Sequence, residues 1–265
     1  MEEKTKEQRH EEYLRKIPEF TLMDDTFMNA CFNEQKELVQ KILRIIMNKP
    51  ELIVTNSQIQ KVYKNLHGRS VTLDIDAVDT DDTKMDVEIQ QDNRGAKPER
   101  ARFISSIIDA NILDPGDNFD ELPETYVIFI TENDVLKMGQ PIYHIRRTIE
   151  GSERLFNDKS HIIYVNGSIQ DDTPLGRLMH DFHCKNAADM YDKDIAERVN
   201  QLKSTEGGKQ YMCKILDELV EDRSVEIAYN LLKLNDYSNE KIASITGLTI
   251  EKVKELAETL KPQTA

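Results

Sequence analysis

The sequence predicts an α/β fold with a mixed central sheet, because strand-like stretches are interspersed with stretches of helical periodicity. Apolar side chains recur at three- and four-residue steps over residues 26–48, which predicts an amphipathic helix broken near Asn33. The run TYVIFIT at 125–131 is apolar on both faces, as in a strand covered on both sides of a sheet. The order of helix, three strands, helix and strand favours a mixed sheet.

The remaining elements follow from alternation and turn residues. Pro98 opens a helix near 98–113, which the DPGD sequence ends. After the last strand the chain is predicted to be helical to its end. The predicted strands span residues 59–65, 70–78, 84–90, 125–131, 142–149 and 161–167.

Four segments are expected along the chain. They are a charged N-terminal arm (1–17), an α/β core (18–170), a helical extension (171–235) and a helix-turn-helix-like C-terminal pair (236–265). The boundaries follow changes in composition and in hydrophobic period.

The C-terminal pair has the pattern of a helix-turn-helix. Within residues 239–260, Gly247 permits a tight turn and Thr249 can cap the second helix. The outward charges of that helix are mixed rather than basic. We therefore interpret the pair as a packing or dimer-forming element in preference to a reader of the major groove, and a homo-oligomer stays open.

The composition indicates a soluble protein, with 38% hydrophobic and 32% charged residues among 265. The apolar runs are too short to cross a bilayer, so we expect a cytoplasmic protein without a membrane partner. Three scattered cysteines argue against a disulfide framework and for a reducing compartment. The formal net charge of −14 repels nucleic acid at long range, so a DNA substrate would need local positive charge.

Acidic side chains occupy both arms of the hairpin predicted over residues 70–93. Residues two apart share a strand face, so Asp74 and Asp76 project together from one arm, and Asp86 and Glu88 from the other. If the two faces lie side by side, Asp74 comes close to Glu88. Converging carboxylates repel each other unless a cation lies between them, and their oxygens suit Mg²⁺ or Mn²⁺. On spacing alone, an ordinary hairpin with one solvated face is the favoured alternative.

The hairpin and its flanking helices form a recognisable series of stretches. These are DDTFMNACF (24–32), VTLDIDAVD (71–79), VEIQQDN (87–93), PERARFISS (98–106) and LMHDFHCKNAADMY (178–191). Together they resemble the PD-(D/E)XK nuclease family transposases, relatives of the recombination-promoting nucleases. The resemblance covers most of residues 20–235 and implies a restriction-endonuclease-like core at 18–170. It also implies a Mg²⁺- or Mn²⁺-dependent endonuclease that hydrolyses DNA phosphodiester bonds in mobile-element or recombination processes.

The resemblance implies roles for individual residues. Asp74 matches the first Asp of the motif and Glu88 its second acidic residue, both as catalytic metal ligands, and the backbone carbonyl of Ile89 adds a ligand. Gln90 takes the place usually held by Lys. Because an amide accepts no proton at pH 7, Gln90 could only orient a water or the scissile phosphate.

Further candidates surround this set. Asp76 is a possible additional ligand, and Lys84 could supply the missing cation. The superfamily often carries a Glu on its first core helix, for which Glu37 fits better than Glu34. Each has a simpler interpretation: Lys84 is a surface counter-charge, and the glutamates are solvated helix residues.

Basic residues near the next helix are the candidates for DNA phosphate contacts. They are Lys97, Arg100 and Arg102, whose guanidinium groups can hold phosphates by bidentate contacts. The alternative is that the arginines pair with Asp92 or Glu99.

The stretch HDFHC places His180, His183 and Cys184 on one helical face, a spacing compatible with zinc. No further Cys or His lies nearby in the sequence, so ordinary helix packing is favoured. Two function hypotheses remain: the DNA endonuclease, and a catalytically silent interaction or regulatory protein that keeps the fold. Gln90 is the residue that separates them.

Overall fold

The computed structural model describes residues 6–65 and 68–260, and the chain divides into two compact units. One unit runs from Pro18 to Ser204. The other combines the chain before Pro18 with the chain from Thr205 onward, so the boundary falls inside the predicted helical extension.

A few predicted segments extend beyond the described residues. Residues 1–5 of the predicted arm and 261–265 of the predicted C-terminal pair lie outside them. Among the described helices, none is long and apolar enough to cross a membrane.

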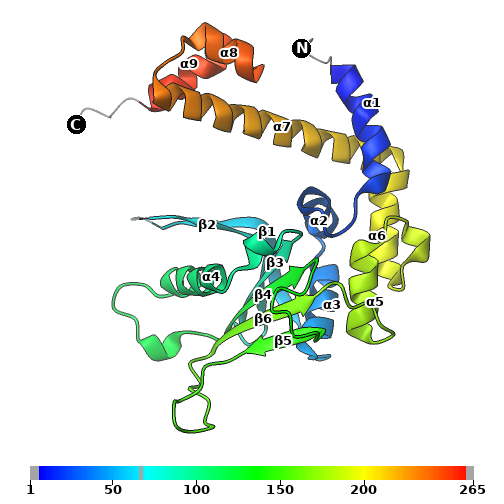
Figure 1. Cartoon of the computed structure of the whole chain (residues 1–265), viewed down its shortest axis with the longest axis vertical. Coiled ribbons are helices and arrows are strands. Elements are labelled where there is room, and N and C mark those ends of the chain that lie inside the picture. The colour runs from blue at the N-terminus through cyan, green and yellow to red at the C-terminus, as the bar shows by residue number, and fades with distance from the viewer. Residues whose placement is uncertain (1–5, 66–67, 261–265) are drawn as a thin grey trace. The chain divides into compact units, whose positions relative to one another are not determined.

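The Pro18–Ser204 unit contains a mixed sheet, which confirms the predicted fold class (Figure 1). Its strands are β1 (Val54–Tyr63), β2 (Val71–Asp79), β3 (Lys84–Gln90), β4 (Thr125–Thr131), β5 (Ile142–Ile145) and β6 (Ser160–Asn166). They lie in the order β1-β2-β3-β4-β6-β5. Strands β3, β4 and β6 are parallel, whereas β1 pairs with β2, β2 with β3 and β5 with β6 in antiparallel fashion.

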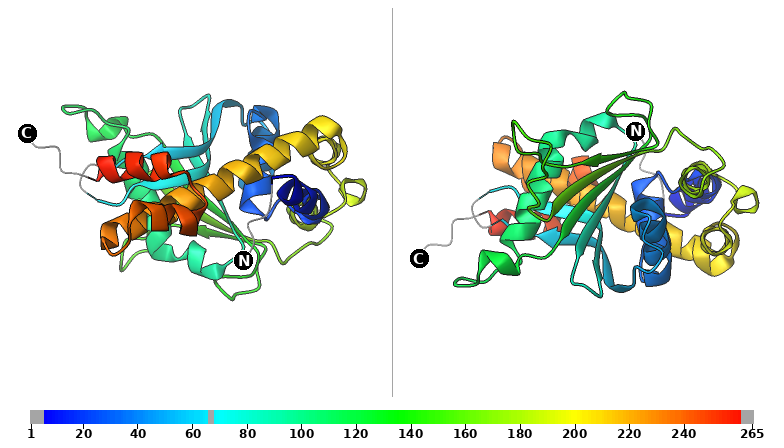
Figure 2. Two further views of the ribbon diagram at one scale, coloured as in Figure 1. Left: turned by 90° about the horizontal axis from the view of Figure 1, so that it is seen from above. Right: turned by 90° about the horizontal axis from the view of Figure 1, so that it is seen from below.

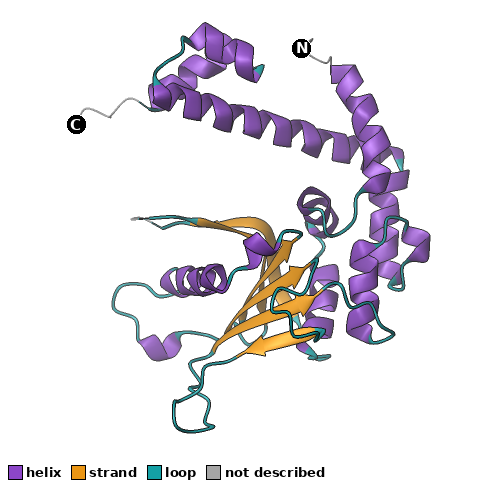
Figure 3. Cartoon of the chain, in the orientation of Figure 1, coloured by secondary structure: helices purple, strands orange, loops and turns teal. Residues whose placement is uncertain are grey.

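Helices cover both faces of this sheet (Figures 2 and 3). On one face lies α4 (Pro98–Ala110), and its apolar side chains form a core with Val127 and Phe129 of β4. On the other face lies α3 (Lys36–Met47), which follows α2 (Asp25–Phe32). The unit ends with α5 (Pro174–His183) and α6 (Lys193–Ser204).

The predicted boundaries differ from the structure at several strand ends and at the end of α4, which stops at Ala110 rather than near residue 113. The break near Asn33 is confirmed, because Glu34 adopts a left-handed φ of 58° between α2 and α3. Strand β1 begins at Val54 rather than at residue 59, since the polar start of this strand pairs with β2. Strand β5 ends at Ile145, because the chain then leaves the sheet in an exposed loop.

The register of β3 on β4 fixes which side chains share a face. Asp86 pairs with Val127 and Glu88 with Phe129. Because paired residues project to the same side of a sheet, these acids lie on the face covered by α4. Met85, between Lys84 and Asp86, faces the α3 side.

The turn from β2 to β3 is held by a side chain of the hairpin itself. Asp79 Oδ1 accepts hydrogen bonds from the backbone N–H groups of Asp81 and Thr83, both at 2.9 Å. This Asx-type arrangement fixes the length and shape of the acidic turn.

The second unit is helical. It comprises α1 (Lys6–Lys16), α7 (Glu206–Leu234), α8 (Asn239–Thr246) and α9 (Ile250–Thr259), and His10 of α1 contacts Asp217 of α7 at 2.8 Å. The C-terminal pair has its predicted turn: Gly247 has a φ of 72°, and Thr249 Oγ1 accepts from Lys252 N. The buried cluster of Ala228, Ile242, Ala243 and Val253 packs the pair against α7, while its role as a packing or dimer-forming element in preference to a DNA reader stays a prediction.

Candidate metal centre

The acidic residues converge where β2 leaves β3. On β2 the ladder to β3 begins at Ile75. Asp74 precedes Ile75, and its Oδ2 accepts a hydrogen bond of 3.0 Å from the backbone N–H of Ile89. The Asp74 side chain therefore satisfies a backbone donor of β3 that would otherwise donate to a β2 carbonyl. Because the N–H and C=O of one strand residue point to the same side, the Ile89 carbonyl also faces β2. The other Asp74 oxygen accepts from Gln60 at 3.3 Å.

Glu88 is fully buried, and Arg100 and Gln90 surround it. Arg100 Nη2 forms an ion pair with Glu88 Oε2. Gln90 Nε2 donates to the same oxygen at 3.4 Å, while Gln90 Oε1 accepts from Arg100 Nη1 at 3.3 Å. Glu88 Oε1 has no hydrogen-bond partner in the part of the chain that the structure describes. One oxygen of this carboxylate is therefore compensated and the other is not.

Asp76 and Asp86 pair directly across the ladder, but their surroundings differ. Asp76 accepts from Lys61 Nζ at 2.6 Å and from the Tyr63 hydroxyl at 2.9 Å. Asp86 is fully buried, and neither of its oxygens has a hydrogen-bond partner among residues 6–65 and 68–260. Lys61 thus neutralises Asp76, whereas no counter-charge contacts Asp86 within the described part of the chain.

Burial and mutual repulsion raise the pKa values of the remaining carboxyls. Burial, with the charge of Asp25 added, raises the pKa of Asp74 to about 6 against the hydrogen bond from Ile89. Burial and then the charge of Asp74 raise the pKa of Glu88 to about 8. Burial and then the charge of Glu88 raise the pKa of Asp86 well above its ordinary value. Near neutral pH the cluster therefore retains protons unless a cation replaces them.

Of the acidic residues described above, Asp74 lines a cavity of about 310 Å³, whereas Glu88 and Asp86 lie behind its lining residues Ile89 and Gln90 on β3. Asp74, Ile89, Gln90 and Arg100 line the cavity, and so does Asp25 at the start of α2. Asp25 was not among the predicted site residues, although it lies in the DDTFMNACF stretch that carries the family resemblance. The sequence stretch that contains Asp25 was recognised, but only the fold shows that the start of α2 lines the cavity.

Other predicted site residues lie elsewhere. Glu37 is exposed in the first turn of α3, and Lys84 begins β3 at the end remote from the cavity. Lys97 and Arg102 are exposed at the start of α4. The cavity lining includes none of these four residues. The structure brings together Asp74, Glu88, Ile89, Gln90 and Arg100.

The donor set fits a hard divalent cation. Asp74, Glu88 and the Ile89 carbonyl offer only oxygen, as Mg²⁺ and Mn²⁺ require. The unpartnered oxygens of Glu88 and Asp86 support this fit, because a buried carboxylate without a donor is costly. Arg100 already supplies one positive charge to Glu88, so an ion would have to share or displace that contact.

The HDFHC stretch forms a second cluster at the end of α5. Ligand atoms of His180, Asp181 and Cys184 lie within 4.8 Å of one another. His183 instead donates through Nδ1 to the Met179 carbonyl at 2.7 Å. Both Asp181 oxygens accept backbone N–H groups of the following loop, so this cluster supports local packing rather than a zinc site.

The comparisons with known proteins concern the α/β unit. A family model described as PD-(D/E)XK nuclease family transposase matches residues 26–168. The matched region contains every described strand of the sheet, together with α3 and α4. No curated protein and no solved structure gives a significant match to the chain.

Proposed function

The chain belongs to the PD-(D/E)XK nuclease family transposases, and we propose that it is a divalent-metal-dependent endonuclease that hydrolyses DNA phosphodiester bonds. The observation that supports this most strongly is that Glu88 Oε1 and both carboxylate oxygens of Asp86 are buried without a partner among the described residues, on the strand whose Ile89 and Gln90 line the cavity. The proposal includes Mg²⁺ or Mn²⁺ as the ion and mobile-element or recombination DNA as the setting.

Asp74, Glu88 and the backbone carbonyl of Ile89 would hold the ion, and Asp25 and Asp86 would add negative charge around it. When bound, such an ion supplies Lewis acidity, which lowers the pKa of water and neutralises charge on the phosphate. The ion also offsets the overall charge of −14 at the point where DNA must approach.

Gln90 and Arg100 are the groups that would contact the substrate. The Gln90 amide can orient a water molecule or a phosphate oxygen, but it cannot take up a proton. Arg100 bridges Glu88 and Gln90 at the cavity, and its guanidinium can hold a phosphate oxygen as well. Proton removal therefore depends on the ion, which makes the reaction steeply dependent on divalent metal.

Gly95 leaves room for the Gln90 amide. A Cβ at position 95 would lie 1.8 Å from Gln90 Oε1, whereas the nearest Arg100 atom is 3.5 Å away. Gly95→Ala therefore moves the amide with little demand on the backbone, and it tests whether the position of Gln90 matters.

The direct test is conversion of supercoiled plasmid to the open-circular form in Mg²⁺ or Mn²⁺, with chelator controls. We expect Glu88→Gln to abolish nicking and Gly95→Ala to reduce it. Glu99→Gln, an exposed glutamate beside Arg100, is the matched control and should nick normally. Gln90→Lys restores the usual residue of the motif and should retain activity.

A second readout follows the ion itself. Mn²⁺ should raise the melting temperature of the protein, because an ion that binds only the native state stabilises it. Asp74→Ala should remove that increase. An undiminished increase in Asp74→Ala would refute these ligands.

One observation supports the second candidate function, a catalytically silent interaction or regulatory protein. Arg100 occupies a cation position against Glu88, and Gln90 replaces the usual Lys. Absence of nicking by the wild type across divalent ions and low salt, with an intact Mn²⁺ shift, would favour an interaction or regulatory protein.

A further inference from the structure

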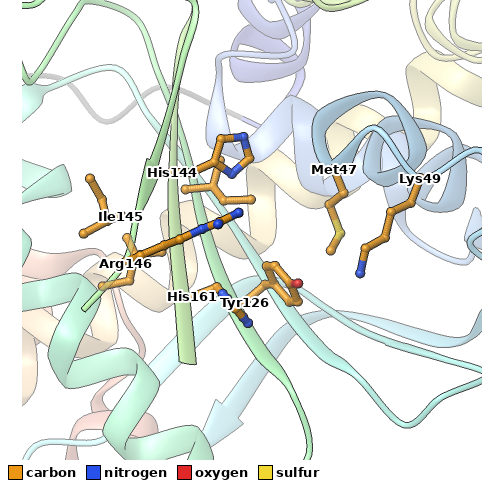
Figure 4. Close-up of a pocket in the computed structure, with 9 residues that line it drawn as sticks. Met47, Lys49, Tyr126, His144, Ile145, Arg146 and His161 are labelled. Carbon is orange, nitrogen blue, oxygen red and sulfur yellow. The ribbon is translucent and has the colours of Figure 1, made fainter. Parts of the chain in front are cut away.

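Basic side chains gather around a second cavity of the Pro18–Ser204 unit, with a volume of about 150 Å³ (Figure 4). Lys49 follows α3, His144 and Arg146 come from β5 and its end, and His161 comes from β6. Figure 4 shows Lys49 and Arg146 extending from opposite sides toward the space beside Tyr126. Three separate segments therefore bring basic side chains to one small cavity, and Lys49 and Arg146 bring its positive charge.

This cavity is separate from the acidic cluster. Tyr126 pairs with Met85, so it lies on the α3 side of the sheet, whereas Glu88 lies on the α4 side. Along β4, Tyr126 also lies three residues before Phe129, the partner of Glu88, which is about 10 Å of strand. A ligand here would not contact the candidate metal ligands.

The two cations of this cavity, Lys49 and Arg146, differ from other exposed cations of the unit in converging on one space. In the described chain, no carboxylate lies within ion-pair distance of Lys49 or Arg146, as is also true of other exposed cations such as Lys97 and Arg102, which do not line this cavity beside a second cation. In a chain of formal charge −14, two unpaired and converging cations point to an external anion. Among the lining residues, His161 contacts a carboxylate, with its Nε2 3.2 Å from Glu124 Oε1.

The surroundings of His144 agree with this positive field. Burial lowers the pKa of His144, and the charges of Arg146 and His161 lower it further. An anion in the cavity would relieve that repulsion.

The floor of the cavity is built from stacked rings. Tyr126 and His161 stack with centroids 4.4 Å apart and planes inclined by 17°. Lys49 Nζ lies 5.1 Å from the centre of the Tyr126 ring. These contacts orient the Lys49 ammonium and the imidazole before any ligand binds.

We propose that this basic cavity binds a phosphate monoester, either the 5′-phosphate of a nucleic-acid end or the phosphate of a free nucleotide. An ammonium, a guanidinium, imidazole N–H groups and a phenol offer donors from several directions. A monoester phosphate presents three terminal oxygens that can accept them together, which a carboxylate with two oxygens in one plane matches less well.

The test measures binding of two oligonucleotides of identical sequence, one with a 5′-phosphate and one with a 5′-hydroxyl, by fluorescence anisotropy in chelator. Chelator keeps the metal site out of the measurement. We expect the phosphorylated strand to bind about tenfold more tightly to the wild type, as charge-assisted hydrogen bonds would give. Lys49→Ala and Arg146→Ala should each reduce this ratio toward one, and both side chains are exposed, so the variants should fold. Lys36→Ala, an exposed lysine at the start of α3, should keep the ratio.

Titration with inorganic phosphate and with a nucleoside 5′-monophosphate distinguishes the sources. If these bind the wild type but not Arg146→Ala while the two oligonucleotides bind equally, the ligand is the free nucleotide. If no phosphate compound distinguishes the wild type from Lys49→Ala and Arg146→Ala, the proposal is overturned.

Discussion

Asp181 and Asp86 are both fully buried in the Pro18–Ser204 unit, yet only one of them is given hydrogen-bond donors. Asp181, near the end of α5, accepts the backbone N–H groups of Tyr191 and Asp192, both at 2.8 Å. Asp86, in the middle of β3, has no hydrogen-bond partner on either oxygen within the described residues. The Asp181 carboxylate holds a loop in place, whereas the Asp86 carboxylate adds negative charge beside Glu88 and Asp74, which already repel each other.

The difference teaches how to separate a structural acid from a functional one. A buried carboxylate that accepts two N–H groups lowers the free energy of the fold, and its removal leaves those donors unpaired. A buried carboxylate without donors raises that free energy unless a proton or a metal ion compensates it. The same substitution at the two positions should therefore have opposite effects.

The largest effect is expected at Asp181. Asp181→Leu leaves two backbone N–H groups buried without acceptors, which should lower the free energy of unfolding by about 3–5 kcal/mol. Chemical denaturation of the metal-free protein measures this. Asp181→Asn keeps an acceptor and should lose less. A loss below that of Asp181→Asn would break the comparison.

Next in size is the pH dependence of the metal-free protein. Because the pKa values of Asp74 and Glu88 are raised in the fold to about 6 and about 8, the folded state binds more protons than the unfolded state between roughly pH 4 and pH 8. The contribution of these groups to stability is present below that window and lost as pH rises through it. We expect the free energy of unfolding to fall by about 2–4 kcal/mol across it.

The slope should be smaller in Glu88→Gln and in wild-type protein saturated with Mn²⁺, since neither has a proton to lose at Glu88. Denaturation series at several pH values measure all three. An identical slope in all three would place the titration elsewhere.

A smaller loss is expected where the hairpin already has a counter-charge. Lys61→Met removes the ammonium that contacts Asp76 and leaves this buried carboxylate with only the Tyr63 hydroxyl. Because Lys61 is partly exposed, we expect a loss of about 1–2 kcal/mol, less than for a fully buried pair. Lys64→Met, an exposed lysine of the same segment, is the control in the same denaturation measurement.

The smallest effect carries the opposite sign. Asp86→Leu replaces an unpartnered carboxyl by an apolar group beside Val127, and it should stabilise the metal-free protein by about 1 kcal/mol. The same variant should gain less stability from Mn²⁺ than the wild type does. Destabilisation comparable to that of Asp181→Leu would show that Asp86 is a structural acid after all.

Much of the fold could be predicted because its signals are local. The apolar run of β4, Pro98 at the start of α4 and the Gly247 turn each follow from a few neighbouring residues. The early start of β1 could not be predicted, because its polar residues become strand only through pairing with β2. At the start of β1, pairing with β2 outweighs the low intrinsic strand propensity of the polar residues.

The same division applies to the site. Strand parity predicts that Asp74 and Glu88 converge, since both lie on one hairpin. Asp25 and Arg100 line the cavity from α2 and α4. The alternation of residues within the hairpin could not predict their positions, because they lie outside the hairpin. The alternation of strand faces also cannot show that Asp76 has a counter-charge and Asp86 has none in the described chain. That difference depends on whether Lys61 of β1 reaches Asp76 on the neighbouring strand.

The hydrogen bonds of Asp79 make the length of the β2–β3 turn a requirement of the chemistry. That turn lies at the opposite end of the hairpin from the cavity that Asp74 lines. As long as the Asp79 hydrogen bonds keep the turn at its present length, an added residue has to shift β2 against β3 by one position and exchange its two faces. Asp74 would then no longer meet the backbone of Ile89. Insertions and deletions between Asp79 and Lys84 should consequently be far less tolerated than those in the exposed loop after β5, although neither segment touches the cavity.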